Sequence, residues 1–373
     1  MYLGRLFLLL ALLASFSTLR GQDIHYTMFN MAPLKINPAN TGNFYGTVRV
    51  GGIFRDQWFS ILDDEYKSPS FYFDAPIIRG FRDQDWVGVG LSVVSDRVGL
   101  GNLRTSGSLL SASYHYALDK KGTRILTLGV QGGSISRKLE TGMFLAGDAQ
   151  QMILEGTNNA QSTDPLLTSS GNTGGGGPGN RDQSDIEGSY LDINAGVTYK
   201  QVDEKAGTLL ELGFAVGHIN QGDESFGSGG GNTTGGGGGN NNNNKDSKRP
   251  MSLLMHGRYV YPVNDVWSAE PSFLFQTNAG GGNNIILQGV AGYQFNDQIK
   301  LKGGLGYRVG DSGQIIIGAV IDELLEVGLS YDLNFSELSG VSNYQGGFEL
   351  AASYIIRMYK KPEIKPSILC PRF

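Results

Sequence analysis

LDINAGVTYK, residues 191–200, carries an apolar side chain at every second position. In an extended chain these apolar residues share one face, and Asp192, Asn194, Thr198 and Lys200 share the other. A period of two is that of a β-strand whose two faces meet different surroundings. The same alternation recurs at residues 210–217 and 325–333. The sequence therefore predicts an all-β protein.

The alternating runs are about ten residues or longer, which is the length that a tilted strand needs to cross a bilayer. An even strand number is typical of transmembrane antiparallel barrels, and the sequence contains about fourteen runs. We expect strands near 46–60, 66–78, 86–97, 104–118, 123–137, 186–202, 207–219, 250–262, 266–278, 283–296, 299–310, 313–322, 324–335 and 345–359.

The connections between these strands alternate in length. Outer-membrane barrels have short periplasmic turns and longer external loops. With a periplasmic start, the connections at 80–85, 119–122, 203–207, 262–265, 296–298 and 322–323 are periplasmic, and all are short. The long connections at 138–185 and 221–249 then lie outside the cell, with the low-complexity inserts 174–177 and 235–244. We expect no second domain.

A soluble sandwich or small barrel would show the same alternation with its apolar face turned inward. Here the opposite face carries charged residues beside many glycines, and about fourteen long strands enclose a lumen too wide for side chains to fill. The sequence therefore favours a polar lumen and an apolar, lipid-facing surface. The charged positions on the inward face are Asp192, Glu211, Lys302, Arg308, Glu326, Asp332, Glu349 and Arg357.

The two ends of the chain differ from the barrel. Arg5, the apolar run 6–14 and the small, polar residues 15–21 predict a secretory signal peptide over residues 1–21, and hence export to a Gram-negative outer membrane. Residues 22–45 include the Pro- and Asn-rich stretch 32–42, which cannot be a lipid-facing strand, so we expect a strap or plug in the periplasm or the lumen. The barrel would then occupy residues 46–359. The proline-containing end, 360–373, cannot continue the sheet and should form a periplasmic tail.

No motif for chemistry stands out. The four histidines, His25, His115, His218 and His256, are widely spaced and form no paired-ligand motif, so neither a metal site nor a cofactor is expected. The glycine-rich runs lack the lysine and hydroxyl residue of a phosphate-binding loop. A net charge of -5 and the lack of basic clusters argue against nucleic-acid binding. With Cys370 as the single cysteine, no disulfide framework is possible. We expect a protein that is not an enzyme.

Several segments together resemble the PorP/SprF family of type IX secretion proteins. They are DIHYTMF at 23–29, APLKINPANTG at 32–42, FRDQW at 54–58, GVGL at 88–91, DRVG at 96–99 and YHY at 114–116. The end of the chain, CPRF at 370–373, is similar to the short tail with which members finish. The resemblance covers nearly the whole chain after residue 21 and departs from the family only in the two Gly/Asn-rich inserts.

The resemblance implies an outer-membrane component of the type IX secretion system, often linked to gliding motility. It implies as partners secreted cargo with a type B C-terminal sorting domain, a periplasmic OmpA-like subunit and outer-membrane lipid. We expect the contacts to periplasmic subunits at the two ends of the chain, at Asp23, His25, Phe29, Pro33, Asn37, Pro38, Cys370 and Phe373. Two alternatives stay open: a channel for hydrophobic or small polar solutes, for which a glycine-rich lumen would leave room, and an outer-membrane enzyme.

Overall fold

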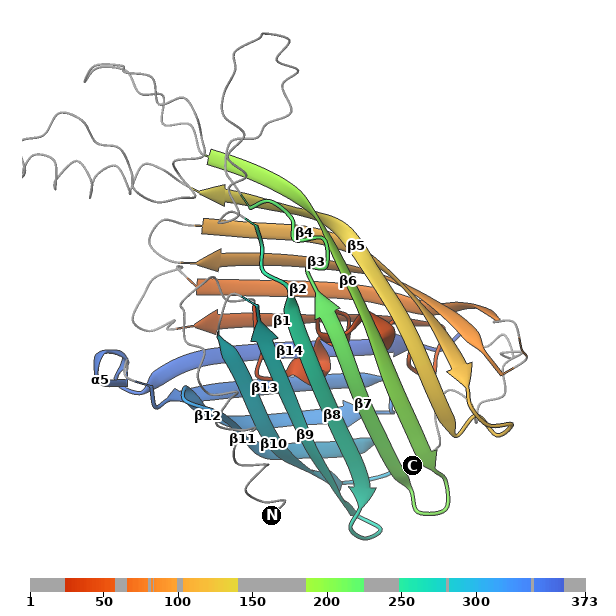
Figure 1. Ribbon diagram of the computed structural model, residues 1–373. Helices are drawn as coiled ribbons and strands as arrows, with labels where there is room; N and C mark the ends of the chain where they lie inside the picture. Colours follow the sequence, from red (N-terminus) through yellow and green to blue (C-terminus); the bar gives the residue numbers. More distant parts are fainter. Residues whose placement is uncertain are drawn as a thin grey trace, which may run out of the picture.

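The computed structural model describes residues 24–57, 66–79, 82, 84–98, 103–139, 186–224, 248–279, 282–336 and 339–358. Fourteen antiparallel strands form one closed barrel, in which β1 pairs with β14 (Figure 1). The prediction of an all-β barrel of about fourteen strands is confirmed. The strands are β1 Val48–Gln57, β2 Tyr66–Arg79, β3 Trp86–Val98, β4 Leu103–Ala117, β5 Arg124–Leu139, β6 Ile186–Asp203, β7 Thr208–Gly217, β8 Ser252–Pro262, β9 Trp267–Asn278, β10 Asn283–Gln294, β11 Ile299–Arg308, β12 Ser312–Ile321, β13 Leu325–Asn334 and β14 Gln345–Ile356.

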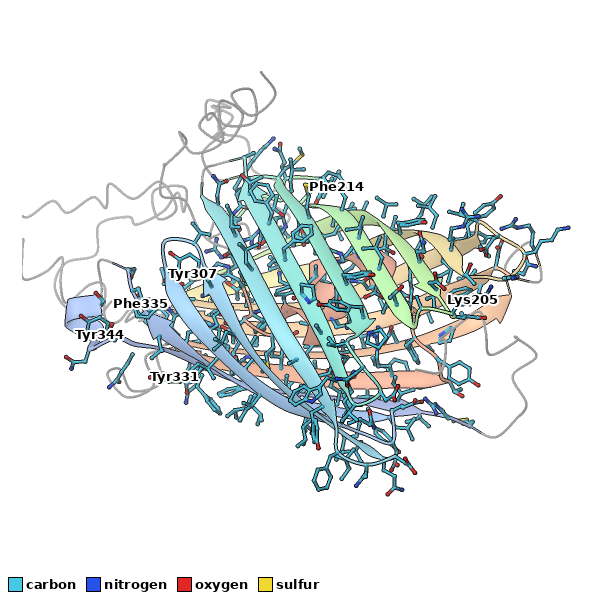
Figure 2. All side chains as sticks on the ribbon, turned by 90° about the horizontal axis from the view of Figure 1, so that it is seen from below. Lys205, Phe214, Tyr307, Tyr331, Phe335 and Tyr344 are labelled. Atoms are coloured by element: carbon cyan, nitrogen blue, oxygen red, sulfur yellow. The ribbon has the colours of Figure 1, made fainter. Side chains whose placement is uncertain are left out.

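The alternation in the sequence separates the two faces of the wall. Large apolar side chains such as Leu110 and Leu305, each 68% exposed, lie on the outer face, as do Phe214 and Tyr307 (Figure 2). Polar side chains at the intervening positions, among them Gln314 and Glu349, are buried inside. The outer face is the one that lipid would cover. None of the helices in the described residues is long and apolar enough to cross a membrane.

The barrel has two different ends. At one end, which we call the turn end, short connections join β2 to β3, β4 to β5, β6 to β7, β8 to β9, β10 to β11 and β12 to β13. Val48, the first residue of β1, and Ile356, the last residue of β14, pair at this same end. At the loop end, the connections include residues 140–185 and 225–247, which lie outside the described residues, as do the predicted signal peptide and the predicted tail at 360–373.

The N-terminal segment, residues 24–47, lies inside the barrel. It folds into three short turns, η1 Phe29–Met31, α2 Pro33–Ile36 and η2 Pro38–Asn40, seen as red ribbon within the ring of strands (Figure 1). Pro33 and Pro38 each stand at the first position of a turn, where the missing N–H costs no hydrogen bond. The sequence left two locations open for this segment, the periplasm and the lumen. In the structure these residues lie in the lumen.

Candidate functional site

The N-terminal segment makes hydrogen bonds to every strand of the barrel. Its polar atoms lie within 3.5 Å of a donor or acceptor on each strand in turn, so it crosses the lumen from wall to wall. The partner residues, from β1 to β14, are Arg55, Asp74, Trp86, Ser111, Gln131, Val197, Phe214, His256, Ser272, Gln288, Arg308, Gln314, Asp332 and Glu349. We treat this lumenal interface as the candidate functional site.

Thr27 lies at the centre of a buried ionic cluster. Its backbone N–H donates to Oε1 of Glu349 at 2.6 Å, and its hydroxyl donates to Oδ1 of Asp332 at 2.6 Å. Arg55 joins the same two carboxylates, at 2.5 Å from Glu349 and 2.9 Å from Asp332. Arg308 donates to the Thr27 hydroxyl oxygen at 3.1 Å. Buried charges are tolerated when they are paired and hydrogen-bonded, and here the segment supplies part of that pairing.

Apolar residues of the segment anchor it on the side walls. Phe29, which is 2% exposed, packs with Ile36 of the segment and with Leu274 and Ile286 of the barrel. A second cluster joins Met28 and Met31 to Ile53, Ile316 and Ala351, among others. The inward face is therefore apolar where the segment presents apolar side chains. These contacts hold the middle of the segment by burial as well as by hydrogen bonds.

Asn37 holds the turn of η2 against strands β6 and β7. Its Oδ1 accepts from the N–H of Ala39 at 2.9 Å, and its Nδ2 donates to the carbonyl oxygens of Val197 and Phe214 at 3.1 and 3.2 Å. The side chain is fully buried. An amide has both the donors and the acceptor that these three contacts need, whereas a carboxylate has only acceptors.

The segment leaves the lumen at the turn end through a tight passage. The indole N–H of Trp86 donates to the carbonyl oxygen of Gly42 at 3.0 Å, and the carboxylate of Asp74 accepts from the Gly42 N–H at 2.7 Å. Gly42 has φ +68°, and a Cβ there would lie 2.8 Å from the Cα of Gly88. The ring of Trp86 stacks on His115 with centroids 4.3 Å apart, and that histidine contacts the Thr41 carbonyl oxygen at 2.8 Å.

Strand glycines make the space that the segment occupies. A Cβ on Gly129 would lie 2.3 Å from the backbone N of Ala39, and one on Gly196 would lie 2.1 Å from Oδ1 of Asn37. On Gly328 it would lie 2.8 Å from the sulfur of Met28. At Gly129 and Gly196 these distances are far inside van der Waals contact, so glycine is needed for the segment to approach these two walls, whereas the Met28 side chain beside Gly328 could shift. The inward glycines, which suggested an empty lumen, instead make room for the N-terminal segment. We call this segment, residues 24–47, the plug.

The residues predicted from the sequence as partner contacts are mostly enclosed. Phe29, Pro33, Asn37 and Pro38 are buried within the barrel, and His25 lines a cavity on the loop side of the segment. Asp23, Cys370 and Phe373 lie outside the described residues. The predicted contacts would require the strap to reach the periplasmic, turn end, but Ile24 lines that loop-side cavity, and the segment runs from there to β1 at the turn end. Whether these residues contact partners stays a prediction.

Sequence reasoning missed the residues that hold the segment. Thr27, Arg55 and Trp86 were not named as site residues, although Arg308, Asp332 and Glu349 were recognised as inward-facing charges. A buried cluster of mixed charges inside a predicted lumen was the available signal. Among the described residues, no group of three or more His, Cys, Asp or Glu side chains is arranged to hold a metal ion.

The family model described as "Type IX secretion system membrane protein PorP/SprF" matches residues 18–354. The chain belongs to this family. The resemblance to this family is thereby confirmed, and the matched range includes the N-terminal segment and nearly all of the barrel, while the end of the chain at 370–373 lies beyond it. No curated protein matches this PorP/SprF chain significantly.

Solved structures similar to this PorP/SprF protein include a toluene transporter, a hydrocarbon channel and a porin, each at low identity. The Pseudomonas putida toluene transporter TodX is 12% identical, with 87% of this chain and 93% of that chain covered and a TM-score of 0.42. The CymD monoaromatic hydrocarbon channel is 12% identical, with 91% and 96% covered and a TM-score of 0.44. A KdgM porin in complex with disordered oligogalacturonate is 7% identical, with 83% and 99% covered and a TM-score of 0.35.

Proposed function

We propose that this protein is a non-enzymatic outer-membrane component of the type IX secretion system that binds exported proteins. Its activity is to support the export or surface anchoring of partners with a type B C-terminal sorting domain, an activity often linked to gliding motility. Membership in the PorP/SprF family supports the link to the secretion system. Export by a signal peptide over residues 1–21 and location in the outer membrane belong to the same proposal.

The N-terminal segment that crosses the lumen is the observation that most favours binding over solute transport. A channel for hydrophobic or small polar solutes needs a continuous path, and the inward glycines were the argument for one. Gly129 and Gly196 instead border Ala39 and Asn37 of the N-terminal segment. A channel would therefore require this segment to leave a site where it is bonded to every strand. Solute flux through purified protein in bilayers tests that alternative.

The contacts to a periplasmic OmpA-like subunit belong to the turn end in this proposal. Cys370 and Phe373 would supply them through the tail. His25, Phe29, Pro33, Asn37 and Pro38 would reach such a subunit only after the segment has left the lumen, because the barrel encloses most of these side chains. While the segment lies in the lumen, its role is to block the barrel, and it is held there by its buried residues Phe29, Pro33, Asn37 and Pro38.

Deleting the gene tests the proposal. The expected result is loss of export or surface retention of a secreted partner, with uptake of small solutes unchanged. Normal surface display of all proteins with a type B sorting domain would contradict it.

Alanine substitutions separate docking from folding. We expect Phe373→Ala to reduce partner export and co-purification of the periplasmic subunit while heat-modifiable folding of the barrel stays normal. We expect Asn37→Ala to reduce both folding stability and export, because it removes three buried hydrogen bonds. Normal export with Phe373→Ala would remove the tail from the site.

A further inference from the structure

An apolar groove of about 660 Å³ lies on the outer face of the barrel, across strands β7 to β11. Most of its lining comes from two neighbouring rows of outward side chains, in which each residue stands beside the next on the adjacent strand. One row includes Tyr259, Pro271, Gly289 and Leu305, and the other includes Phe273 and Leu287. The lining residues between the two rows, such as Gln288, turn their side chains into the lumen. The groove therefore opens to the outside of the barrel and not to the lumen.

The groove is hollow because one row has small residues at its centre. A Cβ on Gly289 would meet nothing within 4 Å, and Pro271 stands directly opposite this glycine on β9. On either side of the pair, the large side chains of Tyr259 and Leu305 are exposed. The result is a hollow with a floor and two side walls, set in an outer face that elsewhere carries large apolar side chains.

The groove lies within the band of the outer face that hydrocarbon covers. The rings of Trp267 and Tyr293, with centroids 4.9 Å apart, stand at the turn ends of β9 and β10. Aromatic rings at strand ends are typical of the membrane–water interface. Pro271 is four residues further along β9 than Trp267, about 13 Å at 3.3 Å per residue. Tyr307 marks the loop end of β11 on the same outer face (Figure 2). The molecules around the groove are therefore acyl chains.

The outward surface of the groove carries no charge. Arg258 is the single charged residue in its lining, and the Arg258 guanidinium points inward and donates to Glu211 at 2.6 and 3.0 Å. Among the outward lining side chains, only Tyr259 and Tyr307 have polar atoms. Protein interfaces need about one hydrogen bond per 100–200 Å², and phosphorylated headgroups are held by basic side chains. The lining thus matches hydrocarbon better than a protein surface or the phosphorylated sugar of a glycolipid.

We propose that this groove is a binding site for one acyl chain of a phospholipid. The chain lies over Pro271 and Gly289, between Tyr259 and Leu305, and gains van der Waals contact from the floor and both walls. A chain elsewhere on the barrel touches the outer face on one side only, so the groove holds its lipid longer. The inference goes beyond the role in secretion and is independent of it. In the working complex, strands β7 to β11 then face bilayer lipid, and partner barrels contact other strands.

Filling the groove tests this inference. Gly289→Trp places a ring over the floor, and the barrel should still fold because a Cβ at this position meets nothing. Ala112 is exposed on the outer face of β4, and Ala112→Trp is the matched control. Each folded protein, verified by heat-modifiable mobility, is placed in phosphatidylethanolamine vesicles that contain the same lipid with a diazirine on its acyl chain. After illumination, labelled peptides are mapped by mass spectrometry.

In the native protein we expect the strongest labelling at residues 257–273 and 287–307. This labelling should fall several-fold in Gly289→Trp and stay unchanged in Ala112→Trp. Even labelling around the whole barrel would mean that lipid covers the outer face without a site and would overturn the inference. Unchanged labelling of residues 257–273 and 287–307 in folded Gly289→Trp would also overturn it.

A second measurement identifies the occupant in living cells and does not depend on filling the groove. Leu305→p-benzoyl-phenylalanine places a photo-crosslinker on one wall. The expected product is a crosslink to phospholipid, identified by its mass. A crosslink to a second copy of this chain, to another protein or to lipopolysaccharide in place of phospholipid would contradict the assignment.

Discussion

The backbone N–H of Thr27 donates to Oε1 of Glu349 at 2.6 Å, although 322 residues separate the two in the chain. The bond joins the plug to the last strand of the barrel, and the next N–H, that of Met28, donates to the other oxygen of the same carboxylate at 2.8 Å. Glu349 is also paired with Arg55 on β1, the strand with which β14 closes the barrel. One side chain thus connects barrel closure to plug binding.

Glu349→Gln should loosen the plug. The substitution removes a buried carboxylate from Arg55 and turns one N–H acceptor into a donor. Breaking one partner of a buried ion pair costs about 3–5 kcal/mol. We expect faster proteolysis of the N-terminal segment in the folded barrel and a lower temperature of heat-modifiable unfolding. Glu323→Gln, at an exposed turn-end carboxylate 3.4 Å from Arg357, is the control and should cost less than about 1 kcal/mol. Equal effects of the two variants would contradict the role of Glu349.

Gly129→Ala should displace the plug through steric contact. The added Cβ would lie 2.3 Å from the backbone N of Ala39, where no side chain can rotate away. Overpacking of this kind costs about 1–3 kcal/mol. Gly289→Ala is the control, because a Cβ on this strand glycine meets nothing within 4 Å. Protection of the segment from protease should fall in the first variant and stay unchanged in the second. Full protection from protease in both variants would mean that the segment does not need a glycine at position 129.

The orientation of the barrel in the membrane can be read with epitope tags. Tags inserted at residues 174–177 or 235–244, in loop-end connections, should be labelled on intact cells. A tag beside Lys205, at the turn between β6 and β7 (Figure 2), should be labelled only after the outer membrane is permeabilised. The opposite pattern would reverse the orientation and would place the loop-side cavity in the periplasm.

Asp85 stabilises the turn end, and its contribution should depend on pH. Burial favours its neutral form, but hydrogen bonds from Arg82, the Ala117 N–H and Tyr114 outweigh burial and lower the pKa of this carboxyl. A carboxyl whose pKa is lower in the folded protein stabilises the fold at pH values above its ordinary pKa of about 3.9. This stabilisation is lost as the pH falls through the folded-state pKa.

Asp85→Asn should therefore destabilise the barrel by about 1–3 kcal/mol near neutral pH, and the difference from the native protein should disappear in acid. Urea unfolding at several pH values measures it, with Asp297→Asn at another, exposed turn as the control. A difference that does not change with pH would contradict the assignment.

The alternation at residues 191–200 was enough to predict β6, because strand period depends on neighbouring residues alone. The same reasoning predicted the closed barrel, since alternating long runs with unequal connections have few other arrangements. For the N-terminal segment the sequence predicted a strap or plug but left two locations open, the periplasm and the lumen. Its interface depends on residues that are distant in the chain, such as Thr27 and Glu349, and no local pattern distinguishes Gly129 or Gly196 from an ordinary strand glycine.

Single-channel recording in planar lipid bilayers tests most directly the central claim that the N-terminal segment plugs the lumen. Purified full-length protein should carry no steady current. A variant lacking residues 24–44, with its barrel folding verified by heat-modifiable mobility, should open a steady pore, because the segment bonded to every strand has been removed. A steady current through the full-length protein, with its N-terminal segment still protected from protease, would contradict the claim.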